Sequence, residues 1–114
     1  MNIYLVMKQL LILLVLFFYS NTALSNQNTG PVKITAVENW AGSESLFVWT
    51  DESTKTNPAN CSYSGSYLTS SNIKDVFITL LLSANIANKK TQLTIYGDGC
   101  GNNRPVIVAI KILQ

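Results

Sequence analysis

An apolar segment near the start of the chain leaves only a short remainder to fold. Residues 10–18 are strictly apolar, Lys8 precedes them, and the small residues Ala23 and Ser25 follow a polar stretch. This order is typical of a secretory signal peptide, which we predict over residues 1–25. The run is much shorter than the ~20 residues of a membrane-spanning helix. A retained anchor is the alternative, because counting residues 3–7 lengthens the apolar stretch.

The remainder, residues 26–114, has the length of one small domain. It carries seven basic and six acidic side chains, which gives a net charge of +1. Because no cluster of basic residues stands out along the sequence, we expect no nucleic acid as a partner. Export predicts a secreted or periplasmic protein with no membrane span once the signal has been removed.

Cys61 and Cys100 are the two cysteines of the chain. Disulfides form in exported proteins, and small cores often need them, so we predict the pair Cys61–Cys100. Gly99 and Gly101 flank the second cysteine and let its loop bend to the required geometry. The chain has no histidine. A zinc site or a thiol nucleophile would therefore lack its usual partners, and we expect no metal and no cofactor.

Alternating apolar residues predict three strands in the first half of the domain. They fall in residues 31–40, with Val32, Ile34 and Ala36 on one face, then in 45–50 and 61–69. Residues 39–45, which include Trp40, are predicted to form a turn or short loop between the first two strands. Tyr63 and Tyr67 would share a face of the third strand unless a bulge intervenes at Gly65. We expect residues 26–30 to form a loose N-terminus and the polar residues 51–60 to form a solvent-facing connection.

A helical stripe follows, between residues 71 and 88. Its spacing is i, i+3, i+4, i+7, i+8, i+11, with Ser70 or Ser71 as the N-cap and Asn88 at the end. Ile78 and Leu82 are apolar but lie off the stripe. They predict either an oligomer interface or a helix buried deeply in its own sheet. The stripe itself consists of Ile73, Val76, Phe77, Leu80, Leu81 and Ala84.

Two more strands, over residues 91–97 and 105–113, complete the domain, and the last of them is apolar enough to be central or covered. The element order is β-β-β-α-β-β. This order predicts a mainly β protein with one helix (α+β), built as a small five-stranded OB-like barrel with one disulfide.

Four stretches of the chain resemble the small secreted B subunits of bacterial pentameric toxins of the subtilase cytotoxin and pertussis-like type. They are GPVKITAVEN, CSYSGSYLTS, IKDVFITLLLSANIANKKTQLTIY and CGNNRPVIVAIKIL, and the resemblance extends over nearly all of residues 30–113. The resemblance implies a ring of five subunits with the helices around the pore. It also implies a barrel surface that binds a host glycan or protein receptor, and a catalytic A subunit as partner.

Catalysis has little support, because without histidine the commonest acid–base group is missing. We expect a binding protein instead, with Trp40, Tyr63 and Tyr67 as candidate ligand-binding residues. Aromatic faces stack on sugar rings, and serine and asparagine neighbours hydrogen-bond hydroxyl groups. The alternative is a periplasmic or cell-surface accessory protein that binds no glycan.

Overall fold

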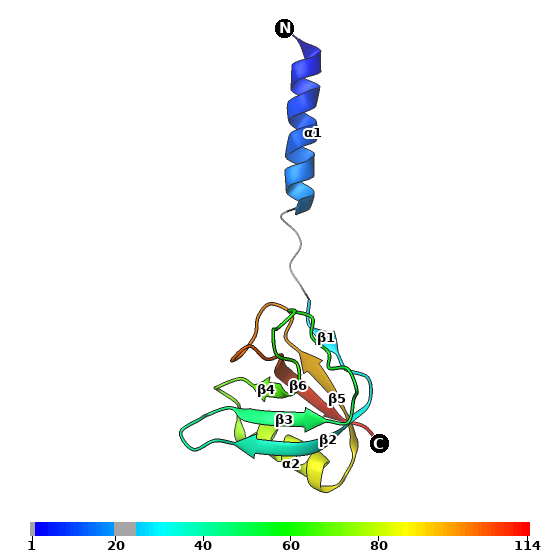
Figure 1. Cartoon of the computed structure of the whole chain (residues 1–114). Helices are drawn as coiled ribbons and strands as arrows, with labels where there is room; N and C mark the ends of the chain where they lie inside the picture. The colour runs from blue at the N-terminus through cyan, green and yellow to red at the C-terminus, as the bar shows by residue number, and fades with distance from the viewer. Residues whose placement is uncertain (1, 20–24) are drawn as a thin grey trace.

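Five strands close into a barrel in the computed structural model (Figure 1), which describes residues 2–19 and 25–114. Side chains are described for residues 2–14 and 25–114. The fold-class prediction is confirmed, including the position of the helix between the third and fourth barrel strands. The elements of the barrel are β2 (Val32–Asn39), β3 (Leu46–Thr50), β4 (Tyr67–Thr69), α2 (Asp75–Ile86), β5 (Lys90–Ile95) and β6 (Val106–Ile112).

Strand pairing follows the OB-type pattern. β2, β3 and β4 pair antiparallel in sequence, and β4 then pairs parallel with β6. β6 pairs antiparallel with β5, and β5 returns to the start of β2, which closes the sheet on itself. β6 therefore has a neighbour on both sides, as its apolar sequence predicted.

Two bulges change which side chains face the core. The register of β2 against β3 shifts between Ile34 and Ala36. As a result Ala36, which we expected on the inner face, is exposed, and Val37 packs against the core instead. The register of β5 against β6 shifts between Thr94 and Ile95, and Val108 of β6 is left exposed there. Each bulge inserts one residue into a strand and reverses the alternation beyond it.

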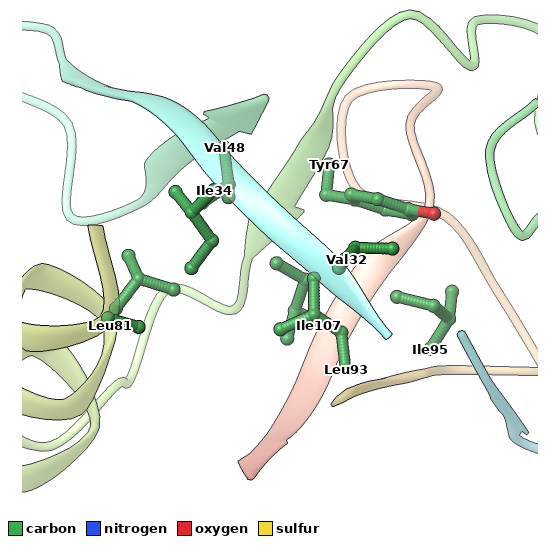
Figure 2. Packing of buried hydrophobic residues seen from close by; sticks show 9 residues of the cluster. Val32, Ile34, Val48, Tyr67, Leu81, Leu93, Ile95 and Ile107 are labelled. Atoms are coloured by element: carbon green, nitrogen blue, oxygen red, sulfur yellow. The ribbon is translucent and has the colours of Figure 1, made fainter. Parts of the chain in front are cut away.

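The core lies inside the barrel, between its strands and α2 (Figure 2). Every barrel strand and the helix contribute to it, so no element folds around a core of its own. Full burial of one such aliphatic side chain stabilises the fold by about 1.5–3 kcal/mol. The nine core residues are Val32, Ile34, Val48, Tyr67, Leu81, Ala84, Leu93, Ile95 and Ile107.

Helix α2 packs against β2 and β6 through Phe77, Leu81 and Ala84. Its start differs from the prediction. Lys74 occupies the N-cap without a side-chain hydrogen bond, so neither Ser70 nor Ser71 caps the helix. The end agrees with the prediction, since Asn88 adopts a φ of 52° just beyond the C-cap.

The backbone completes a Schellman motif at this end of α2. The Asn88 N–H donates to the Asn85 carbonyl at 3.2 Å, and the Lys89 N–H donates to the Ala84 carbonyl at 3.1 Å. These bonds satisfy two carbonyls that the end of the helix would otherwise leave unpaired.

The segment expected to be a loose N-terminus is instead part of the sheet. β1 (Gln27–Asn28) pairs antiparallel with the end of β5. Thr29 is buried, and its hydroxyl accepts a 3.0 Å hydrogen bond from the Leu93 N–H. The Gly97 N–H donates to the Asn26 side chain at 2.9 Å. The hydrophobic pattern does not predict this strand, because its side chains are polar. Its hydrogen bonds to β5 hold it in the sheet instead.

Helix α1 (Ile3–Tyr19) contains the apolar segment of the sequence. Among the described helices, none is both long and apolar enough to cross a membrane. The role of residues 1–25 as a signal peptide stays a prediction, and Ala23 of its cleavage motif lies outside the described residues.

Candidate functional site

A groove of about 510 Å³ lies where the β2–β3 loop and the β5–β6 loop meet above β4. We call it the loop groove. The β2–β3 loop contributes Ser45, and the segment after β4 contributes Ser70 and Ser71. The rest of the lining is Leu68 and Thr69 of β4, Tyr96, Cys100, Gly101 and Asn102 of the β5–β6 loop, and Val106 and Val108 of β6.

The disulfide fixes one wall of the loop groove. Cys61 and Cys100 are bonded, with their Cα atoms 5.8 Å apart, which confirms the predicted pair. The Asn57 side chain anchors Cys61 by accepting from its N–H at 2.8 Å and donating to its carbonyl at 3.0 Å. The disulfide thus ties the β5–β6 loop to a turn that the Asn57 side chain holds by two hydrogen bonds.

Gly101 continues this wall, and its close packing explains why a glycine follows Cys100. A Cβ at this position would lie 2.9 Å from Leu68 Cδ2 and 3.0 Å from Val106 Cγ2. The backbone at Gly101 therefore packs directly against the side chains of Leu68 on β4 and Val106 on β6. Any larger residue at this position would have to displace them.

The tip of the β5–β6 loop is a tight two-residue turn. Gly101 and Arg104 exchange backbone hydrogen bonds of 2.8 and 2.9 Å. The two residues between them, Asn102 and Asn103, have φ angles of 47° and 63°. This left-handed pair is the geometry of a type I′ turn, which asparagine tolerates better than most residues. The turn brings Asn102 to the rim of the loop groove.

The lining combines one aromatic ring with neutral polar groups. Tyr96 is 38% exposed, and Leu68, Val106 and Val108 supply apolar surface. Ser45, Ser70, Ser71 and Asn102 supply hydroxyl and amide groups. Thr69 is less available, because its hydroxyl already accepts from the Leu46 N–H at 2.8 Å. No charged residue lines the groove, so the chemistry suits an uncharged ligand with many hydroxyl groups.

Tyr67 is removed from the ligand-binding candidates, because its side chain is enclosed in the core. Its phenol is bonded to the Glu52 carboxylate and the Thr56 N–H. The third strand is shorter than predicted and begins only at Tyr67. Tyr63 therefore lies outside it, and the two tyrosines do not share a strand face.

Tyr63 is exposed, but one face of its ring is covered. The Arg104 guanidinium lies 4.3 Å from the Tyr63 ring centroid and 4.9 Å from the Phe47 centroid. Such cation–π contacts fix the position of the arginine and link residues 61–66, which we call the cysteine segment, to β3. Tyr63 is not part of the loop groove.

Trp40 is 65% exposed in the β2–β3 loop, as its sequence context indicated. Its indole N–H donates to the Glu38 carboxylate. It lies outside the lining of the loop groove, so the structure does not bring the three predicted aromatic residues together. Tyr96, the groove's own ring, also stood out in the sequence as an aromatic residue with polar neighbours, but we ranked it below those three because we expected it to pack within the fourth barrel strand.

The helix has a second apolar surface, which we call the outer helix face. Ile78 is half-buried, whereas Leu82 is exposed. Two members of the predicted inner stripe, Val76 and Leu80, are exposed as well. Helical periodicity places Val76 and Ile86, which is 83% exposed, on the side of α2 opposite Leu81, with Leu80 and Leu82 on its two flanks. Asp75 is the one charged residue within α2.

Residues 2–19 and 25–114 contain no group of three or more histidine, cysteine, aspartate or glutamate residues that could hold a metal ion. No protein-family model matches the chain, and no curated protein sequence shows significant similarity to it.

Proposed function

We propose that this is an exported, non-catalytic binding protein that takes a neutral saccharide into the loop groove. The observation that carries the proposal is the position of the groove on the barrel. OB-type barrels bind oligosaccharides and oligonucleotides with the loops that follow their first and fourth strands. Here those loops are the β2–β3 and β5–β6 loops, and both line the groove.

The chemistry of the lining supports a sugar rather than a nucleic acid. A tyrosine ring offers a face for the apolar side of a pyranose, and hydroxyl and amide groups can exchange hydrogen bonds with its hydroxyls. A nucleic acid would need basic residues along its backbone, and none lines the groove. The volume of about 510 Å³ lies in the range of small-ligand pockets.

A glycan array probed with the oxidised protein tests this proposal. Tyr96→Ala removes the ring and should weaken binding to neutral glycans about tenfold, equivalent to ~1.4 kcal/mol. Tyr63→Ala and Trp40→Ala are controls, because both remove an exposed ring outside the groove. Unchanged binding by the Tyr96 variant, with loss in the Trp40 variant, would move the site to the β2–β3 loop and refute the proposal.

The outer helix face favours a second function, that of an interaction subunit. Exposed apolar side chains gathered on one surface are typical of protein–protein interfaces. We propose self-association through Leu82 and its neighbours, as a ring of five if the toxin resemblance extends to assembly. A catalytic A subunit would then be the natural partner of the ring. An accessory protein that uses this face for another partner is the alternative.

Sedimentation velocity separates these arrangements. A discrete oligomer should dissociate when Leu82→Lys places a charge on the outer helix face. Ser62→Lys, at an exposed position in the cysteine segment, is the control and should leave the oligomer intact. A monomeric wild-type protein would refute self-association and favour the accessory role.

A further inference from the structure

We propose that Asp98 and Gly99 form a site of spontaneous covalent modification, at which the aspartate isomerises and lengthens the backbone beside the loop groove. The dipeptide lies in the β5–β6 loop, between Tyr96 and Cys100. The chain has six glycines, and Gly99 is the one that follows an aspartate or asparagine. A glycine at this position favours the reaction, because it has no Cβ to hinder the approach of its own amide nitrogen to the aspartate side chain.

The reaction exchanges one amide bond for another. The Gly99 amide nitrogen attacks Cγ of Asp98, and a carboxyl oxygen leaves as water with the amide proton and the carboxyl proton. The product is a succinimide ring. Water then adds to the main-chain carbonyl carbon of this ring, and the bond from that carbon to the nitrogen breaks. The chain now runs through Cβ and Cγ of residue 98, with a free carboxylate on its Cα. Nothing is oxidised or reduced, and the mass returns to its original value.

Both reacting groups are accessible in the folded protein. Asp98 is exposed, and Gly99 is partly exposed. Within residues 25–114, the structure gives no hydrogen-bond partner to the Asp98 carboxylate or to the Gly99 N–H. The attack therefore does not first have to break a hydrogen bond of the fold, which would raise its barrier.

The other two aspartates of the chain are less suited to this reaction. Asp51 accepts a hydrogen bond of 2.9 Å from the Lys33 backbone N–H, and a glutamate follows it. Asp75 begins α2 and precedes Val76, whose β-branched side chain crowds its own amide nitrogen. We expect Asp98 to isomerise faster than either by about tenfold or more.

The segment between Tyr96 and Cys100 is held at both ends. The Tyr96 N–H donates to the Val106 carbonyl at 2.8 Å. Cys100 is held by its disulfide bond to Cys61. Isomerisation adds one atom to the backbone between these two anchors. The extra length must therefore be taken up by the residues in between, which include Gly99.

Gly99 packs against the ring that lines the loop groove. A Cβ at Gly99 would lie 3.3 Å from Tyr96 Cε2, so a displacement of Gly99 changes the support of this ring. Tyr96 is the one aromatic residue in the lining of the groove. Isomerisation should therefore weaken binding in the loop groove as the protein ages. This consequence rests on the proposed function, whereas the reaction itself does not.

Peptide mapping tests the reaction. The oxidised protein is incubated at neutral pH and physiological temperature, then reduced, unfolded and digested with an endoproteinase that cuts before aspartate but not before isoaspartate. Cleavage before Asp98 should decline with the time of incubation, whereas cleavage before Asp51 and Asp75 should persist. Undiminished cleavage before Asp98, or an equal decline at all three aspartates, would overturn the inference.

NMR spectroscopy of the same samples tests the effect on the groove without a ligand. The ring signals of Tyr96 should shift in the aged protein. Asp98→Glu is the matched control, because it keeps the charge but can cyclise only through a larger ring that forms more slowly. Its Tyr96 signals should stay in place. Unmoved Tyr96 signals in isomerised wild type would refute the link between residue 98 and the groove.

A glycan array separates this inference from the proposed function. Aged wild type should bind neutral glycans more weakly than fresh protein, and aged Asp98→Glu should not. If Tyr96→Ala leaves glycan binding intact, the saccharide proposal fails, while the peptide map and the ring signals still decide whether residue 98 isomerises and moves the ring.

Discussion

The phenol of Tyr67 donates a hydrogen bond of 2.5 Å to Oε1 of Glu52 and thereby joins the barrel core to the connection between β3 and β4. The same carboxylate oxygen accepts from the Thr50 hydroxyl at 2.9 Å. The phenol oxygen in turn accepts from the Thr56 N–H at 2.8 Å. The polar connection that we expected to face solvent is therefore folded onto the core, with Tyr67 at its centre.

Tyr67→Phe should destabilise the protein by about 1–3 kcal/mol, because it keeps the ring and leaves the partners of the hydroxyl unpaired. Urea denaturation at neutral pH measures the change. Tyr63→Phe is the matched control, since Tyr63 is 48% exposed and lies outside the core, and it should have little effect. Equal midpoints for the two variants would show that the Glu52–Tyr67 bond contributes nothing to stability.

Stability should also fall in strong alkali because of the same residue. Burial, and next the hydrogen bond to Glu52, raise the pKa of Tyr67 far above its ordinary value near 10. The folded state thus keeps the proton at a pH where the unfolded chain releases it. The stabilisation is complete below pH about 10 and is lost as the pH rises above it.

Comparison of wild type with Tyr67→Phe at pH 8 and pH 11 isolates this contribution, since other groups titrate in both proteins. The difference in the free energy of unfolding should shrink at the higher pH. A constant difference would mean that Tyr67 ionises equally easily in the folded and unfolded states.

The order of strands and helix could be predicted from local hydrophobic patterns, because each pattern depends only on residues that are close together in the sequence. The alternation around Leu93 and Ile95 and the helical spacing of Phe77, Leu81 and Ala84 are of this kind. The bulge after Ile34 could not be predicted, because the strand pairing determines it. Tyr63 and Tyr67 show the same limit. They have similar sequence surroundings, yet one is exposed and the other is buried.

The loop groove depends on contacts between distant parts of the chain, so it was not visible in the sequence. The loop groove needs Ser45 and Asn102 to meet across the barrel end. The Cys61–Cys100 pair was the one long-range contact that counting alone could predict.

Removal of the disulfide should cost roughly 4 kcal/mol in the chain-entropy model, because the bond closes a loop across 39 positions. The double variant Cys61→Ser, Cys100→Ser leaves no unpaired thiol and is the cleaner test. Its midpoint in urea should be far below that of the oxidised wild type. Wild type measured in excess reductant should approach the variant, and unchanged midpoints in both would refute a stabilising role.

Gly101→Ala should lower stability by about 1–3 kcal/mol, because the new methyl group has no space against β4 and β6. Its Cβ would lie 2.9 Å from Leu68 and 3.0 Å from Val106. Gly30→Ala is the matched control, since a Cβ at Gly30 meets no atom within 4 Å and needs no left-handed backbone.

The control variant should be neutral or stabilised by up to ~1 kcal/mol, because alanine restricts the unfolded chain. Thermal unfolding of both variants in parallel measures the difference. Since Gly101 also lines the loop groove, its variant should lose affinity for neutral glycans at temperatures where it remains folded. A Gly101→Ala protein as stable as Gly30→Ala would show that the wall of the groove yields easily and that its tight packing does not shape the site.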